Sequence, residues 1–116
     1  MADNIRLHVS GTPDQARTVI EQVLQADGFR FTWEGPGKAV VERGSRKKAL
    51  WLGVLALHYK YVLLMYPQEG SVVIDLALGT TGMHGGAIGM VKIRNKLDEI
   101  EHSLKAAFHS AGTLIT

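Results

Sequence analysis

The carboxylate cluster near residue 100 is the first place to look for acid–base chemistry. Asp98, Glu99 and Glu101 lie there, close to several lysines. A general acid needs a carboxyl group withdrawn from water, because burial is what raises its pKa toward neutrality. Helical spacing instead places these three side chains on a polar helix face. We interpret the cluster as a solvated surface.

The histidines and serines show no catalytic or metal-binding spacing. His102 and His109 lie two helical turns apart, about 10 Å along the axis, which is too far for one shared metal ion. No serine stands in a Gly-x-Ser-x-Gly motif. The chain has no cysteine, which excludes thiolate ligands and cysteine nucleophiles. The sequence therefore predicts a protein that is not an enzyme and that has no metal site and no cofactor.

A glycine-rich stretch, Gly79–Ile93, leads into the longest helical pattern of the chain. Backbone amides at a helix start can bind anions, but this stretch matches neither the dinucleotide nor the phosphate-loop motif. Two pairs of glycines recur four residues apart, Gly82 with Gly86 and Gly85 with Gly89. Each glycine inside a helix costs about 1 kcal/mol relative to alanine, so a compensating contact is expected. We favour close packing over an anion site or a hinge.

Basic side chains concentrate in the turn that follows residue 43. Arg46, Lys47 and Lys48 are candidate contacts for a phosphate group or an anionic lipid surface. The net charge of the chain is only +2, so the simpler interpretation is a solvated turn. Nucleic-acid binding is not favoured, because the aromatic residues do not alternate with the basic ones as a stacking surface requires.

Length and composition indicate one globular domain over residues 1–116. The chain is 46% hydrophobic and 21% charged, which is ordinary for a folded domain of this size. No signal-peptide pattern begins the sequence, and the absence of cysteine suits a reducing compartment, so we expect a cytoplasmic location. The apolar runs 49–57 and 61–66 are separated by His58 and Lys60, which leaves them short of the roughly 20 residues of a membrane-spanning helix.

Hydrophobic periodicity defines the expected elements. Alternating side chains predict strands over residues 5–10, 29–34, 38–43, 61–66 and 71–78. Apolar residues at 3.6 spacing predict helices over about residues 13–27 and 84–110. Thr12, Pro13 and Gln15 form a capping box at the first helix, and residues 67–70 are predicted to form a turn. The segment 49–57 fits either a strand or a buried helix, and we favour the strand.

This order of elements, β-α-β-β-β-β-β-α, predicts an α+β fold. The last helix would be roughly 35–40 Å long, whereas five strands side by side span about 24 Å. The helix must then lie across the whole sheet. The expected structure has two layers, an antiparallel sheet of five to six strands and both helices on one of its faces. In element order alone, the chain resembles the TATA-binding-protein-like and helix-grip architectures, the latter including the plant-allergen and lipid-transfer fold.

The later strands are apolar on both faces, which leaves more apolar surface than one core needs. Such surface usually marks a contact with a partner or a ligand. We favour a homo-oligomeric protein-interaction module. The alternative is a pocket for a hydrophobic small molecule or lipid between the last helix and the sheet, lined by Trp33, Trp51, Tyr61, Met65, Met90 and Ile93. A weaker alternative is peripheral membrane contact or anion binding. The candidate interface or ligand contacts are Trp51, Leu55, Leu57, Tyr61, Met65, Gly82, Gly85, Gly86, Gly89 and Met90.

Overall fold

The computed structural model describes residues 4–44, 59–79 and 86–116. In chain order the elements are β1 (Asn4–Ser10), α1 (Pro13–Ala26), β2 (Arg30–Gly35), β3 (Lys38–Arg43), β4 (Tyr59–Gln68), β5 (Ser71–Leu78) and α3 (Gly86–Ala111). The five strands form one antiparallel sheet in the order β1-β5-β4-β3-β2. The predicted α+β fold is confirmed, whereas the possible strand over residues 49–57 lies outside the described residues.

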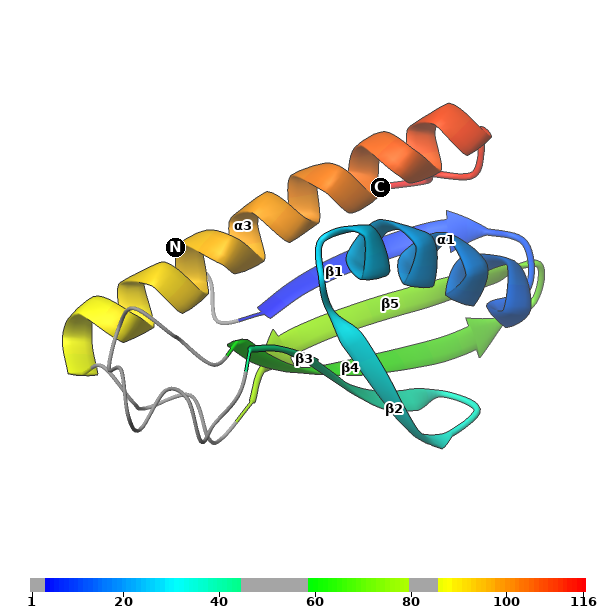
Figure 1. Cartoon of the computed structure of the whole chain (residues 1–116). Coiled ribbons are helices and arrows are strands. Elements are labelled where there is room, and N and C mark those ends of the chain that lie inside the picture. Colours follow the sequence, from blue (N-terminus) through cyan, green and yellow to red (C-terminus); the bar gives the residue numbers. More distant parts are fainter. Residues whose placement is uncertain (1–3, 45–58, 80–85) are drawn as a thin grey trace.

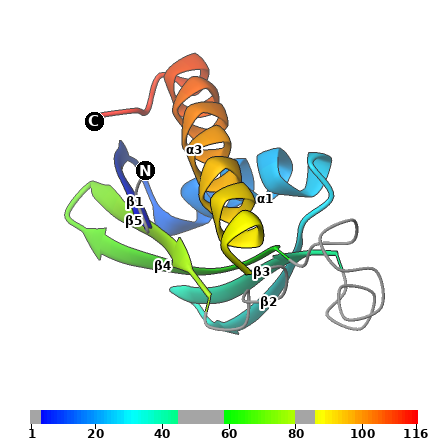
Figure 2. The same cartoon turned by 90° about the vertical axis from the view of Figure 1, so that its left-hand side faces the viewer.

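Both helices lie on the same face of the sheet, and α3 crosses it obliquely (Figures 1 and 2). Its 26 residues give a length of about 39 Å. The face of the sheet that meets the helices is apolar in every strand, because residues paired across strands share a face. Leu7 pairs with Ile74, Ile74 with Met65, and Leu63 with Ala39, and all of these side chains are buried.

The helices contribute the second half of the core. In α3 the predicted stripe is buried at Ile93, Leu97, Ile100, Leu104 and Phe108. In α1 every fourth residue is fully buried, namely Ala16, Ile20 and Leu24. This spacing follows from the 3.6-residue turn, which returns every third or fourth side chain to the sheet.

Local signals set the ends of α1 as expected. The Thr12 hydroxyl accepts a hydrogen bond from the Gln15 amide at 3.2 Å, and the Gln15 side chain accepts one from the Thr12 amide at 3.0 Å. This reciprocal pair satisfies two amides that the helix itself leaves without partners. Gly28 follows the helix with φ +87, a backbone conformation that glycine adopts without steric cost.

One predicted boundary was wrong. Pro67 and Gln68 belong to β4, where they pair with Val72 and Ser71, and the turn starts only after them. Proline usually interrupts a central strand because it has no amide proton. Here the amide of Met65 donates to the carbonyl of Gly37, just before β3. Amides two residues apart in a strand point to the same side, so position 67 faces the β3 side of β4, past the residue at which β3 begins. The missing proton therefore breaks no bond to β5.

The C-terminal residues add a contact that the sequence did not predict. Leu114 forms a bridge with Val9, the amide of Ser10 donates to the carbonyl of Thr113, and the amide of Ile115 donates to the carbonyl of His8. The second half of β1 is therefore paired on both sides. The opposite edge of the sheet is β2, which carries a register shift between Trp33 and Gly35.

Candidate functional site

The sheet face that points away from the helices, here called the outer face, carries an apolar patch. It runs across the three strands β3, β4 and β5, since Val40 pairs with Val62 and Tyr66 pairs with Val73. Tyr66 is 47% exposed, and the other members are half-buried. The members of this outer-face patch are Val40, Val62, Leu64, Tyr66, Val73 and Ala77. The prediction that β4 is apolar on both faces is therefore confirmed.

A charged pair interrupts the patch on β5, because Asp75 lies between Val73 and Ala77 and opposite Leu64, with Arg6 at the border on the β1 side. Asp75 is only 8% exposed, although it lies on the outer face. Its carboxylate accepts hydrogen bonds from the guanidinium of Arg6 at 3.1 and 3.3 Å. A nearly buried carboxylate is tolerated only when it is paired and hydrogen-bonded. The pair is neutral as a unit, so the patch beside it has no net charge from these two residues.

His8 and Ser71 form a second polar contact at this border. His8 Nε2 and Ser71 Oγ lie 2.9 Å apart. Proximity of an imidazole to a hydroxyl is the first requirement of a nucleophilic site, but such a site also needs a third group to orient the imidazole. Within the described residues, no side chain is recorded at the other ring nitrogen of His8. We interpret the pair as a polar contact at the edge of the patch, and its 63-residue separation explains why sequence spacing did not indicate it.

Two of the predicted contact residues are part of the core. Tyr61 is 0% exposed and Met65 is 5% exposed, and both face the helices. The Tyr61 hydroxyl donates to the backbone carbonyl of Ile93 in α3 at 2.8 Å. Burial, together with the charges of Tyr59 and Glu99, raises the pKa of Tyr61 well above its ordinary value. At this level α3 and the sheet are in direct contact, with no space between them for a ligand.

The other predicted contacts are less fully described. Trp51, Leu55, Leu57, Gly82 and Gly85 lie outside the described residues, as do Arg46, Lys47 and Lys48. Gly86, Gly89 and Met90 are among the first five residues of α3.

The structure also describes Trp33 from the predicted pocket and Gly79 from the glycine-rich stretch. Trp33 packs against Phe31 and lies under the guanidinium of Arg17, 4.1 Å from the ring centre, and not beside Tyr61. Gly79 opens the glycine-rich stretch, and a Cβ there would lie 2.9 Å from the carbonyl oxygen of Lys60. This contact is between Gly79 and β4, so the close packing expected of Gly82, Gly85, Gly86 and Gly89 stays a prediction.

A polar cleft lies where the end of β3, the start of β4 and the first half of α3 meet. Its volume is about 260 Å³, and its lining residues are Arg43, Tyr59, Lys92, Asn95, Lys96 and Glu99. A narrower hollow of about 210 Å³ continues from it between α1 and α3 and shares Lys96 and Glu99. The sequence did not bring these residues together, because they come from three elements that the sheet and helix packing place side by side.

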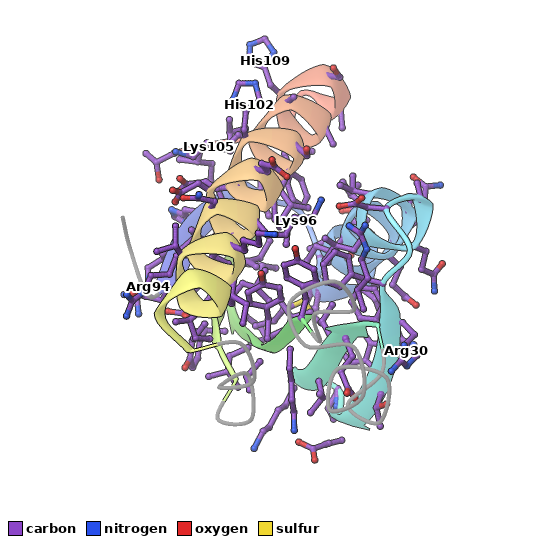
Figure 3. All side chains as sticks on the ribbon, turned by 60° about the vertical axis from the view of Figure 1, so that its left-hand side comes forward. Arg30, Arg94, Lys96, His102, Lys105 and His109 are labelled. Carbon is purple, nitrogen blue, oxygen red and sulfur yellow. The ribbon has the colours of Figure 1, made fainter. Side chains whose placement is uncertain are left out.

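Asp27 at the end of α1 joins the charges of this cleft into a network. Its two carboxylate oxygens contact Lys96 at 2.6 Å and Arg43 at 3.3 Å, and Lys96 also contacts Glu99 at 3.2 Å. Figure 3 shows Lys96 extending from α3 toward α1. Burial lowers the pKa of Lys96, but the hydrogen bonds and negative charges of Asp27 and Glu99 outweigh burial and raise it above its ordinary value. The ammonium group is therefore charged at neutral pH.

Comparison with known proteins adds no family to these observations. No protein-family model and no curated protein matches the chain. Among the described residues, no group of three or more histidine, aspartate or glutamate side chains is arranged to hold a metal ion. No helix within the described ranges is both long and apolar enough to cross a membrane. The outer-face patch and the polar cleft are therefore the two candidate functional surfaces among the described residues.

Proposed function

We propose that this protein is a homo-oligomeric interaction module and that the outer-face patch is its interface with a second copy. The observation that carries the proposal is the row of apolar side chains from Val40 through Val62 to Ala77, with Leu64, Tyr66 and Val73 beside it, on the face without helices. An antiparallel sheet whose second face meets water normally alternates apolar and polar residues. Here β4 places Val62, Leu64 and Tyr66 on that second face, which favours a contact that removes them from water.

A second copy suits this patch better than a charged partner does. In a two-fold symmetric dimer the same surface faces itself, so a patch of one charge sign would repel its own copy. The outer-face patch is apolar, and the neighbouring Arg6 is neutralised by Asp75. Lys38, which lies beside Leu64, contacts Glu34 at 3.6 Å, so the charges in line with Leu64 are compensated within each copy.

The size of the sheet sets the expected strength of the association. Five strands span about 24 Å and strands of about eight residues are roughly 26 Å long, which gives a footprint of about 600 Å². Stable interfaces of standard size bury about 800 Å² on each partner. We therefore expect a dimer that dissociates on dilution and not an obligate one.

Light scattering after gel filtration, over a series of loading concentrations, tests the proposal. The wild-type protein should change from monomer to dimer as the concentration rises. Tyr66→Arg should shift the dissociation constant upward by at least about tenfold, because a buried charge without a partner opposes association. Val91→Arg is the matched control, since Val91 is exposed to nearly the same extent, 45% against 47%, but lies on α3.

Two results would refute the interface. One is a wild-type protein that stays monomeric up to the highest soluble concentration. The other is a dimer that Val91→Arg weakens as much as Tyr66→Arg does, because the contact would then involve α3. Circular dichroism of each variant should confirm that its secondary structure matches that of the wild type.

A further inference from the structure

The polar cleft has more hydrogen-bond donors than its own carboxylates use. Arg43 has five N–H groups, and one pairs with Asp27. Lys92 is exposed, and no hydrogen bond or ion pair is recorded for it within the described residues. The Asn95 amide group and the Tyr59 hydroxyl also line the cleft. These groups form a surface that is rich in donors and suited to an anion.

The net charge of the cleft also favours an anion. Arg43, Lys92 and Lys96 contribute three positive charges, whereas Asp27 and Glu99 contribute two negative ones. One positive charge therefore remains without compensation. Both carboxylates already contact cations, which disfavours a metal ion and favours a ligand that brings negative charge.

Arg43 is held in place before any ligand arrives. Its guanidinium lies over the rings of Tyr59 and Phe29, at 5.6 and 6.0 Å from their centres. Its side chain also runs past Gly28, where a Cβ would be 3.8 Å from Arg43 Cδ. Stacking fixes the plane of the guanidinium. Less conformational entropy is then lost when two of its N–H groups bind two oxygens of a ligand.

The dimensions of the cleft limit the size of the ligand. Its volume of about 260 Å³ lies below the range of roughly 300–1,000 Å³ that is typical of pockets for drug-sized molecules. It therefore suits one small group. A tetrahedral oxyanion offers several acceptor oxygens, which suits Arg43 at the end of β3 together with Lys92 and Lys96, one turn apart on α3, because all three line the same cleft.

From these observations we propose that the polar cleft binds a phosphate group, with Arg43 and Lys92 as direct contacts and Lys96 as the charge at its base. The phosphate is either free or carried by a small organic molecule. This site lies on the helix side of the sheet, away from the outer-face patch. An experiment that refutes the dimer interface therefore does not refute the phosphate site, and the reverse also holds.

Amide chemical shifts of the labelled protein, titrated at constant ionic strength, test the site. Inorganic phosphate and glycerol phosphate are the two probes, with chloride as the reference anion. Saturable shifts centred on residues 43, 59 and 92–99 are expected with at least one probe, and the tighter probe identifies the free or the organic source. Shifts that increase linearly with both probes, or that are as large with chloride, would overturn the site.

Three variants sharpen this titration. Lys92→Gln should weaken phosphate binding by about threefold, which is the effect expected from one exposed charge pair. Glu99→Gln removes a competing carboxylate whose side chain is 69% exposed, and should strengthen binding by a similar factor of about three. Lys105→Gln is the control, because Lys105 is an exposed lysine of the same helix about 20 Å further along its axis.

In Figure 3 Lys105 points away from α1, on the far half of α3, so its removal should leave the affinity unchanged. Equal weakening by Lys92→Gln and Lys105→Gln would show that only the overall charge matters, and would refute a site in the cleft. A Glu99→Gln variant that binds phosphate no more tightly than the wild type would also contradict the proposal. All three substituted positions are exposed, so these variants are expected to fold.

Discussion

The buried hydroxyl of Tyr61 allows a prediction whose sign changes with pH. Replacing Tyr61 by phenylalanine keeps the ring in the core and removes only the hydrogen bond to the Ile93 carbonyl. The net value of such a bond is about 0.5–1.5 kcal/mol. Tyr61→Phe should therefore lower the free energy of unfolding by about 1 kcal/mol at neutral pH, and the melting temperature by roughly 3–5 °C.

At alkaline pH the same hydroxyl destabilises the wild-type fold. The pKa of Tyr61 is raised in the folded protein, so the folded state keeps its proton while the unfolded chain ionises above about pH 10. Stability that depends on a raised pKa is complete below the unfolded pKa and is lost as the pH rises above it. The loss is about 1.4 kcal/mol per pH unit for one group.

The two effects should cancel near pH 11. By then the wild-type protein has lost about 1.4 kcal/mol relative to Tyr61→Phe, which exceeds the initial advantage of about 1 kcal/mol. Urea unfolding curves of both proteins, followed by circular dichroism at several pH values, give the difference directly. All other titrating groups are common to both proteins and drop out of it.

The reasoning would be refuted by a difference that stays constant from neutral pH to about pH 11. In that case Tyr61 would ionise equally in the folded and unfolded states, and its hydroxyl would not be enclosed between β4 and α3. Tyr66→Phe serves as the control for loss of a tyrosine hydroxyl, because Tyr66 is 47% exposed and its hydroxyl is not enclosed between β4 and α3.

Three further predictions concern stability. Thr12→Ala removes half of the capping box and should lower the free energy of unfolding by about 1 kcal/mol, measured by urea unfolding. Leu97→Ala, at a position with 0% exposure, should cost about 2–5 kcal/mol in the same assay, whereas the exposed Asp98→Ala should stay within about 0.5 kcal/mol of the wild type. Gly79→Ala should lower the melting temperature, because its Cβ would lie 2.9 Å from the Lys60 carbonyl oxygen, and an unchanged melting temperature would contradict that close approach.

Local patterns explain how much of the fold could be predicted. The capping box at Thr12, the apolar stripe of α3 and the alternation in β5 each depend on residues a few positions apart, and all appear in the structure. The error at Pro67 had a non-local cause. Whether proline is tolerated there depends on where β3 begins, and no pattern around residue 67 contains that information.

The candidate sites were harder to predict for the same reason. The polar cleft depends on Asp27, Arg43 and Lys96, which are brought together only when α1 and α3 pack side by side on the sheet. Helical spacing places Lys96 one turn from Glu99 on the same helix but contains no information about Asp27 and Arg43. It also placed Tyr61 and Met65 among the candidate contacts, because apolar alternation indicates two faces without saying which of them meets the helices.

The C-terminal contact on β1 has a consequence for aggregation. A sheet with two open edges can add copies at both ends and grow into a fibre. In this fold the second half of β1 is already bonded to residues 113–116, so only its first half can accept a new strand. Copies joined through β2 would have no comparable second edge from which to extend. Removing residues 113–116 should therefore favour fibre formation, which a dye-binding aggregation assay of the full and the shortened chain would measure.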